Sequence, residues 1–261
     1  MNRKVLNFLN LPKTSSYKYC VCLFPYEKTT HYLKGCRKAP YKILKESYNI
    51  EPYDAFLCVN PAEKGIFTTF VNEKNIREII KKNKEKFTVF VGGEHTITYF
   101  IAKEMKNMFN TLLVLDAHPD VMNEYIGNKL SHATWLRRFF EEEKEKEVMI
   151  SGVRVMSEEE KEFLINNKIN YHHKAIKIKN RSLYLSIDVD VLDIGLTTCS
   201  NPEPLGFSWS YLINYLHFIF KHNNVVVTDV TEHNPIQCMR EKSYAVAWLI
   251  YKLFCFKEKY G

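Results

Sequence analysis

The chain has 261 residues, of which 46% are hydrophobic and 26% charged, and its formal net charge is +7. This is a globular composition, and the chain is long enough to bury a full core. No apolar stretch approaches ~20 residues, which argues against a membrane span. The lysines lie in helix-like segments with interleaved glutamates, and no basic stripe with aromatic residues stands out. We therefore expect a solvated surface and no nucleic-acid partner.

Strand-like and helix-like runs alternate along the whole chain. Apolar, β-prone runs predict strands over residues 18–24, 55–59, 88–92, 111–116, 148–153, 182–189 and 225–230. Periodic patterns between them predict helices over residues 37–47, 73–86, 95–108, 131–146, 157–167, 208–222 and 243–257. This alternation implies βαβ units, and so an α/β fold with three layers, α/β/α, around a mostly parallel central sheet. No linker, repeat or low-complexity block interrupts it, which predicts one domain over residues 1–261.

The cysteines indicate a reducing compartment. There are seven, they form no CxxC pair, and no signal peptide stands at the start of the sequence. Reduced thiols in the cytoplasm are therefore expected. Cys20 and Cys22 alternate on one strand-like run, where small apolar fillers are a better interpretation than metal ligands.

Three short polar clusters stand at the ends of apolar runs. They are residues 92–95 (GGEH), 116–120 (DAHPD) and 186–190 (SIDVD), and the runs are FTVFV, TLLVL and SLYLSI. In open α/β sheets, ligands bind beyond the carboxyl ends of the strands. We therefore expect the three clusters to meet at one edge of the sheet.

The clusters contain six candidate metal ligands, all carboxylate or imidazole: His95, Asp116, His118, Asp120, Asp188 and Asp190. Such a set favours a hard or borderline ion such as Mn²⁺ over a structural Zn²⁺. A spacing of two residues sends neighbouring ligands to the same side of an extended segment. If Asp116 and Asp188 both bridge, two ions obtain four protein ligands each. A single Asp or His would more often be a cap or a buried hydrogen-bond partner, but three such clusters are too costly to bury without a cation.

These motifs resemble those of the ureohydrolase family, which includes arginases and agmatinases. The family carries GG[DE]HS, DAHxD and SxDxDxxD, and this chain has GGEHT, DAHPD and SIDVDVLD. Further similar stretches follow the family's order: GCRKAP at 35–40, SGVRVMSEEE at 151–160, NPEP at 201–204 and DVTEHNP at 229–235. The resemblance covers nearly the whole chain and implies the arginase-like form of the α/β fold. Glu94 stands where Asp is more frequent, and Ile194 stands where Pro is usual, but no ligand is lost.

The resemblance also implies a role for each site residue. Two Mn²⁺ ions per subunit would be held by two sets of ligands, namely His95, Asp116, Asp120 and Asp188 for one, and Asp116, His118, Asp188 and Asp190 for the other. Asp120 would also act on the attacking solvent molecule, and Glu232 would receive the guanidinium group of the substrate. His132 matches the family's proton shuttle, and its alternative is a helix-start histidine satisfied by backbone. Apart from the resemblance, the position of His233 next to Glu232 in the sequence makes it a candidate for the pocket wall.

The substrate expected from the resemblance is a guanidino amine. Arginases read the α-carboxylate of arginine partly through an Asn two residues after DAHxD, and Met122 at that position cannot donate a hydrogen bond. Residues 123–134 (NEYIGNKLSHAT) instead resemble the agmatinase pattern. Agmatine ends in an ammonium group, for which Glu124 is an available counter-charge or else a solvated loop residue. The expected activity is thus hydrolysis of agmatine to urea and putrescine, in polyamine biosynthesis. Aminopropylagmatine and arginine remain alternatives.

Two other classes of protein compete with this interpretation. A metal-binding regulatory pseudoenzyme would keep the ligands without releasing urea. A single-metal deacylase shares this type of fold, but its ligand layout is rich in histidine. The family resemblance also implies a homo-oligomer, either a trimer or a hexamer.

Overall fold

The computed structural model describes residues 7–236 and 239–261. Its centre is an eight-stranded sheet in the order β2-β1-β3-β8-β7-β4-β5-β6. The strands are β1 (Tyr19–Phe24), β2 (Ile66–Phe70), β3 (Phe87–Gly92), β4 (Thr111–Leu115), β5 (Glu147–Ser151), β6 (Asn170–His172), β7 (Ser182–Asp188) and β8 (Asn224–Thr231). Every neighbouring pair of strands in the described sheet is parallel. This confirms the predicted mostly parallel sheet and shows that all its described strand pairs are parallel.

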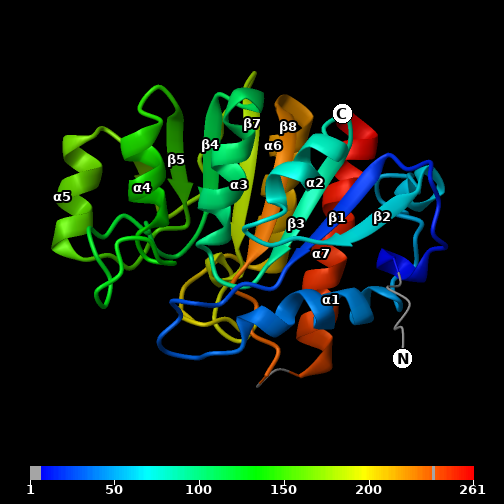
Figure 1. Ribbon diagram of the computed structural model, residues 1–261, viewed down its shortest axis with the longest axis horizontal. Helices are drawn as coiled ribbons and strands as arrows, with labels where there is room; N and C mark the ends of the chain where they lie inside the picture. The colour runs from blue at the N-terminus through cyan, green and yellow to red at the C-terminus, as the bar shows by residue number, and fades with distance from the viewer. Residues whose placement is uncertain (1–6, 237–238) are drawn as a thin grey trace.

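Seven α-helices in the described chain cover both faces of the sheet (Figure 1). They are α1 (Ala39–Ser47), α2 (Ile76–Lys82), α3 (Ile97–Met105), α4 (Trp135–Glu142), α5 (Glu158–Asn166), α6 (Trp209–His222) and α7 (Arg240–Tyr260). Helices α2 to α5 share one hydrophobic core with one face of the sheet, and α1, α6 and α7 share a second core with the other. The predicted three-layer α/β/α class is therefore confirmed.

Strand β1 shows why the strand segments are continuous apolar runs in the sequence. Its residues alternate between the two cores, with Cys20 and Cys22 in one and Val21 and Leu23 in the other. Both faces are buried, so no polar position alternates with the apolar ones. Both cysteines are fully buried, as expected of small fillers.

The predicted strand at 55–59 is wrong. Asp54 Oδ1 accepts hydrogen bonds from the backbone N–H groups of Phe56 (3.1 Å) and Leu57 (2.9 Å), which closes a turn. Phe56 is 73% exposed. A carboxylate that bonds to its own following backbone favours a turn even in an apolar run. The edge strand is instead β2, and neither it nor the three-residue strand β6 was predicted.

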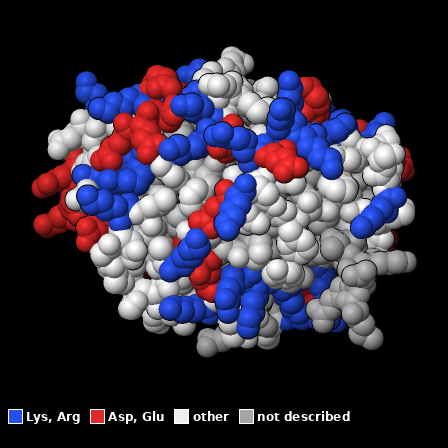
Figure 2. Space-filling view, in the orientation of Figure 1, with Lys and Arg blue, Asp and Glu red and all other residues white. Residues whose placement is uncertain are grey.

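Helix α7 is the core-packed helix expected over 243–257, extended at both ends. Its one buried lysine, Lys252, pairs with Asp54 and lies 5.3 Å from the Trp248 ring. No helix in the described residues is long and apolar enough to cross a bilayer. On the face shown in Figure 2, acidic and basic side chains are interleaved over much of the surface.

Candidate metal centre and active-site cavity

Four neighbouring strands bring the predicted site residues together. His95 follows β3, the 116–120 cluster follows β4, the 188–190 cluster stands at the end of β7, and Glu232 follows β8. These strands are adjacent in the sheet as β3-β8-β7-β4. The six candidate ligands and Glu232 therefore meet at the carboxyl edge of the sheet, as expected for a parallel α/β sheet.

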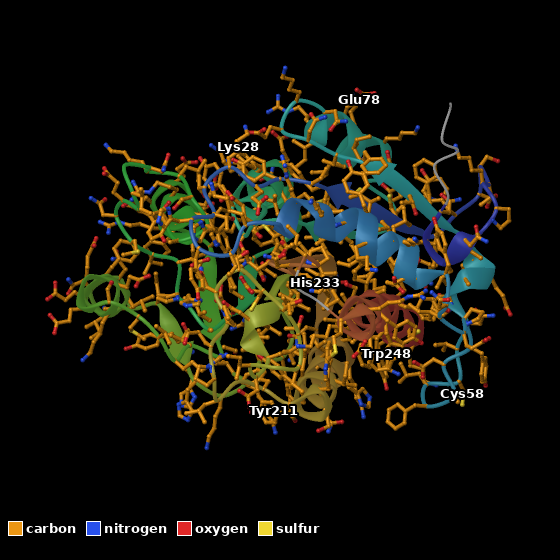
Figure 3. All side chains as sticks on the ribbon, turned by 90° about the horizontal axis from the view of Figure 1, so that it is seen from below. Lys28, Cys58, Glu78, Tyr211, His233 and Trp248 are labelled. Carbon is orange, nitrogen blue, oxygen red and sulfur yellow. The ribbon has the colours of Figure 1, made fainter. Side chains whose placement is uncertain are left out.

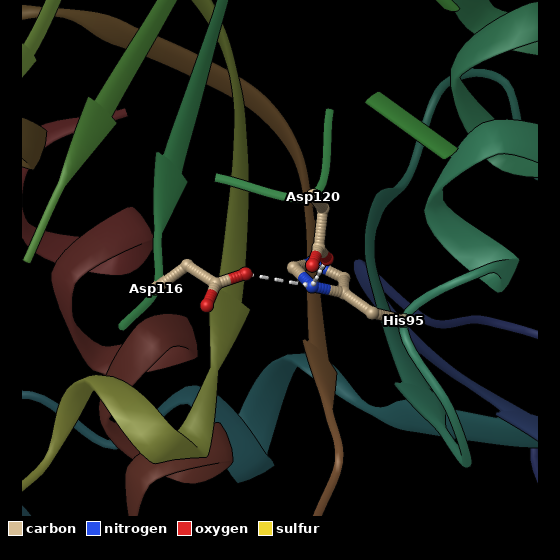
Figure 4. A group of neighbouring side chains, drawn as sticks. All are labelled: His95, Asp116 and Asp120. Carbon is tan, nitrogen blue, oxygen red and sulfur yellow. Dashed lines mark ion pairs between the residues drawn. The ribbon is translucent and has the colours of Figure 1, made fainter. Parts of the chain in front are cut away.

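The candidate ligands form two groups that share Asp116. His95 Nδ1 lies 3.0 Å from Asp116 Oδ2, 3.1 Å from Asp120 Oδ2 and 3.4 Å from Asp188 Oδ2. Figure 4 shows the first two of these contacts. In the second group, His118 Nδ1 lies 2.9 Å from Asp190 Oδ2 and 3.6 Å from Asp116 Oδ1. Within each of two triads the ligand atoms lie within 4.8 Å of one another, and the triads are His95, Asp116, Asp120 and Asp116, His118, Asp190.

The hydrogen bonds behind His95 indicate that its ring is oriented for a cation. The one hydroxyl hydrogen of Ser186 goes to Asp229 Oδ1 (2.8 Å). Ser186 Oγ must therefore accept the hydrogen bond that it makes with His95 Nε2 (2.9 Å). In the neutral ring, the hydrogen is therefore on Nε2, and the lone pair of Nδ1 faces three carboxylates. Neither Nδ1 nor Asp116 Oδ2 has a hydrogen-bond partner among the described residues. Lone pairs in this arrangement repel unless a cation lies between them, so the residues fit a metal ion.

The pKa values in the cluster are shifted by burial and by neighbouring carboxylate charges. Burial and the charges of Asp190 and Asp120 raise the pKa of Asp116 to about 6. Burial and Asp190 also raise the pKa of Asp188 well above its usual value. For His118, burial lowers the pKa, but the charges of Asp190 and Asp116 outweigh burial and raise it to about 12. Negative charge is concentrated here away from water, and a divalent cation would neutralise it.

Trp135 orients Asp120, a role that sequence reasoning missed. The backbone of Asp120 has a left-handed φ of 53°. Its Oδ2 accepts a hydrogen bond from Trp135 Nε1 (2.7 Å), and the Trp135 ring lies 4.7 Å from the His95 ring. Trp135 directly follows the SHAT segment, and Asp229 opens the DVTEHNP segment. Both positions were visible in the sequence without a role attached to them.

A cavity of about 540 Å³ opens onto the two triads. No Lys or Arg of the described chain lines it, although the protein as a whole is basic. Its wall combines acidic, aromatic and small side chains, contributed by Tyr32, His95, His118, Asp120, Met122, Tyr125, His132, Ala133, Glu160, Asp188, Asp190, Ile194, Asn201, Pro202, Glu203 and Glu232.

Glu232 presents a free carboxylate oxygen within this wall. Its backbone φ is 64°, an uncommon conformation that tends to occur at functional sites. Oε1 accepts a hydrogen bond from the backbone N–H of His95 (2.7 Å), and Oε2 is buried without a hydrogen-bond partner in the described chain. Burial and the nearby charge of Glu94 raise the pKa of Glu232 to about 8. A cationic N–H group that pairs with this oxygen would lower the pKa again and so favour the charged carboxylate.

The other predicted pocket residues divide into two groups. Met122 and His132 line the cavity, and burial lowers the pKa of His132, so its imidazole is neutral near pH 7. Glu124 is exposed and is not part of the cavity wall, so the structure does not support contact with a bound substrate. Carboxylates from two other segments, Glu160 and Glu203, line the cavity instead.

His233 does not line the cavity but lies inside the molecule beside α7 (Figure 3). It is 1% exposed, its Nδ1 donates to the Thr198 carbonyl (3.0 Å), and its Nε2 contacts Ser243 Oγ (2.9 Å). Burial lowers the pKa of His233 to about 4. In the unfolded chain the histidine pKa is about 6.5. Between pH 4 and pH 6.5 the unfolded chain therefore binds a proton at this residue, and the folded chain does not. Stability from this residue is therefore complete above pH 6.5 and is lost as the pH falls toward 4.

We expect His233→Gln to flatten this pH dependence. Between pH 7 and pH 4 the wild-type free energy of unfolding should fall by about 3 kcal/mol more than that of the variant. Urea denaturation of both proteins in EDTA, at several pH values, measures the difference. Equal pH dependence in the two proteins would contradict a buried neutral histidine.

Buried carboxylate and imidazole side chains that converge beside an acidic cavity are features of metal-dependent hydrolases. The sequence matches the model of the arginase family over residues 17–255. The chain belongs to the arginase family, and it is a ureohydrolase, a hydrolase of guanidino C–N bonds. The six candidate ligands thus lie in a chain whose family is known.

Several relatives in this family are similar over most of their length. An agmatinase of Pyrococcus horikoshii is 28% identical, with 89% of each chain covered. An N(1)-aminopropylagmatine ureohydrolase of Synechocystis is 27% identical, with 88% of this chain and 85% of the relative covered. The crystal structure of agmatine ureohydrolase of Thermoplasma volcanium superposes with a TM-score of 0.83 at 21% identity, over 99% of this chain and 96% of that one. This last likeness shows that the fold is shared.

Proposed function

We propose that the protein is a binuclear manganese ureohydrolase that hydrolyses agmatine to urea and putrescine, in polyamine biosynthesis. The observation that carries the proposal is the charge of the cavity. Glu232 offers a free carboxylate oxygen beside the two triads, and no Lys or Arg of the described chain lines the wall. A substrate carboxylate would lose its hydration shell in the cavity with no Lys or Arg to compensate. An ammonium group at the end of the substrate could instead pair with Glu160 or Glu203.

Two overlapping sets of side chains would hold the ions. One set is His95, Asp116, Asp120 and Asp188, and the other is Asp116, His118, Asp188 and Asp190. When bound, two Mn²⁺ ions would supply Lewis-acid chemistry, which lowers the pKa of a water molecule so that it can act as the nucleophile near neutral pH.

Glu232, Asp120 and His132 would carry the remaining steps. The Glu232 carboxylate pairs with guanidinium N–H groups and fixes the guanidino carbon in the cavity. The oxygen of the attacking water bonds to that carbon, and Asp120 accepts the proton that this water loses. The C–N bond to the amine then breaks, and the amine nitrogen takes the proton that Asp120 holds. His132, on the same wall, equilibrates protons with bulk solvent.

His132→Asn should therefore lower kcat more than it raises KM. A proton-transfer group contributes to turnover and not to ground-state binding, so we expect kcat to fall by roughly 100-fold and KM to change by less than about threefold. Steady-state urea release together with Mn²⁺ analysis of the purified variant measures both effects. Loss of Mn²⁺ from the variant would show that His132 is a ligand and overturn this assignment.

The substrate choice is tested by comparing agmatine, aminopropylagmatine and arginine. Met122 cannot donate a hydrogen bond and no Lys or Arg of the described chain lines the wall to pair with a carboxylate, so agmatine should exceed arginine in kcat/KM by roughly 10- to 100-fold. Met122→Asn should recover part of the activity on arginine. A wild-type preference for arginine would refute the proposed substrate, and a preference for aminopropylagmatine would extend it to a longer polyamine.

The same proposal includes assembly and location. We infer one domain over residues 1–261, a trimer or hexamer, and a cytoplasmic location, each from the family resemblance or the cysteine pattern. Light scattering of the purified protein measures the assembly. A regulatory pseudoenzyme would bind Mn²⁺ and release no urea from any of the three compounds.

A further inference from the structure

Glu94 lies at the centre of a hydrogen-bonded loop beside the metal centre. The side chain is fully buried, and its two oxygens accept hydrogen bonds from three backbone N–H groups and three hydroxyl groups. The donors are Lys28 N (2.9 Å), Thr29 N (2.8 Å), Thr30 N (3.0 Å), Thr29 Oγ1 (2.8 Å), Thr30 Oγ1 (3.0 Å) and Thr96 Oγ1 (2.8 Å). The Lys28 ammonium lies at the surface (Figure 3), where it pairs with Glu73. Hydrogen-bond donors, and not a cation, therefore stabilise the buried carboxylate.

The Thr29 hydroxyl connects this carboxylate to His132. A hydroxyl has one hydrogen, and that of Thr29 goes to Glu94 Oε1, because a carboxylate can only accept. Thr29 Oγ1 must then accept from its other neighbours, which are the backbone N–H of His132 (3.2 Å) and His132 Nδ1 (3.2 Å). His132 therefore carries its hydrogen on Nδ1. Its Nε2 keeps the lone pair, on a side chain that lines the cavity.

We propose that Thr29 is a positioning residue that links His132 to Glu94 and holds the imidazole in the Nδ1–H form. This inference rests on the proton-transfer role proposed for His132. In this form Nε2 can take a proton while Nδ1–H stays bonded to Thr29, and Nε2 then returns the same proton, so the ring is regenerated. The Glu94 charge, relayed through the hydroxyl, stabilises the transient imidazolium. Tyr125 packs edge-on, 5.0 Å from the His132 ring, and restricts its rotation.

Three variants separate this role from support of the loop. Thr29→Val removes the hydroxyl and keeps the shape of the side chain. Thr29→Ser keeps the hydroxyl. Thr30→Val is the matched control, because Thr30 Oγ1 donates to the same Glu94 carboxylate and otherwise contacts Cys36 Sγ (3.8 Å), not His132.

The first measurement is steady-state urea release from agmatine by each Mn²⁺-loaded variant. For Thr29→Val we expect a roughly 10- to 100-fold fall in kcat, with KM and Mn²⁺ content near wild type. Thr29→Ser and Thr30→Val should stay within about threefold of wild type. An unchanged kcat in Thr29→Val, an equal fall in Thr30→Val, or failure of Thr29→Ser to restore turnover would each overturn the proposal.

The second measurement reads the tautomer directly and does not depend on activity. Protein with ¹⁵N-labelled histidine is loaded with Zn²⁺, which is diamagnetic and accepts the same ligand types. The spectrum of His132→Asn identifies the His132 signals. Wild type, Thr29→Ser and Thr30→Val should show the proton on Nδ1, and Thr29→Val should show it partly or wholly on Nε2.

The two readouts distinguish failure of this inference from failure of the proposed function. An unchanged tautomer in Thr29→Val overturns the link through Thr29, whatever the urea assay gives. A changed tautomer with unchanged kcat overturns the proton-transfer role of His132, and the positioning role of Thr29 with it. Absence of urea release by wild type overturns the proposed function, and the NMR spectra still decide whether Thr29 sets the tautomer.

Discussion

Asp116→Asn is expected to reduce kcat/KM for urea release by at least about 1,000-fold, on the order of 4 kcal/mol. Asp116 is the one residue common to both triads, with Oδ2 facing His95 and Oδ1 facing His118. An amide keeps the shape of the side chain but removes the charge from both groups. Mn²⁺ content should fall from two ions per chain to one or none, as measured by atomic emission on the purified protein.

The same substitution should stabilise the metal-free protein. The pKa of Asp116 is raised to about 6, so at pH 7 the folded state holds a charge that the buried cluster disfavours. Removing that charge should raise the free energy of unfolding in EDTA by up to roughly 3 kcal/mol. Asp193→Asn is the control, because its Oδ1 accepts only a hydrogen bond from the next backbone N–H, that of Ile194 (2.9 Å). Full Mn²⁺ occupancy with wild-type turnover in Asp116→Asn would refute the shared ligand.

Glu232→Gln should lower kcat/KM by about 100-fold, roughly 3 kcal/mol, mainly through a higher KM. The amide can keep the hydrogen bond from His95 N (2.7 Å), so the site should still hold metal. What is lost is the charge of the free Oε2, which a guanidinium would otherwise meet. Kinetics with agmatine and Mn²⁺ analysis on the same preparation measure both parts of the prediction.

Glu124→Gln is the matched control for this experiment. Glu124 is exposed and lies outside the cavity wall, so its variant should stay within about twofold of wild type in kcat/KM. A large rise in KM for Glu124→Gln would mean that this glutamate contacts the substrate after all. A normal KM for Glu232→Gln would remove Glu232 from substrate recognition.

The three clusters of candidate metal ligands could be brought together from sequence because each follows a predicted strand. Each cluster follows a run buried on both faces, and parallel strands deliver their carboxyl ends to one edge of a sheet. The failed strand at 55–59 had the same apolar character. There, the side chain of Asp54 bonds to the backbone of Phe56 and Leu57, a local competition that hydrophobicity does not reveal.

The exposure of Glu124 and the place of Glu203 in the cavity wall could not be predicted because loops set them. Residues 125–128 form a tight turn in which Ile126 and Gly127 both have positive φ, and this turn leaves Glu124 at the surface. Glu203 is held at the cavity by the Arg154 guanidinium, which donates to the carbonyls of Glu203 (3.1 Å) and Asp190 (2.6 Å). Contacts between distant loops of this kind leave no periodic signal in the sequence.

The link from Glu94 through Thr29 to His132 also depends on contacts between segments that are distant in the sequence. The sequence showed Glu94 only as a departure from the more frequent Asp. In the fold, segment 28–30 wraps around its carboxylate and carries Thr29 to within 3.2 Å of His132 Nδ1. These residues are separated by 65 and 103 positions in the chain, so only the folded structure reveals the arrangement.

The most direct test of the account is simultaneous measurement of urea and amine formed from agmatine by the Mn²⁺-loaded protein. The predicted result is urea and putrescine in a one-to-one ratio, with activity lost in EDTA and restored by Mn²⁺. Binding of two Mn²⁺ ions per chain with no urea from agmatine, aminopropylagmatine or arginine would contradict the account and favour a metal-binding protein without this activity.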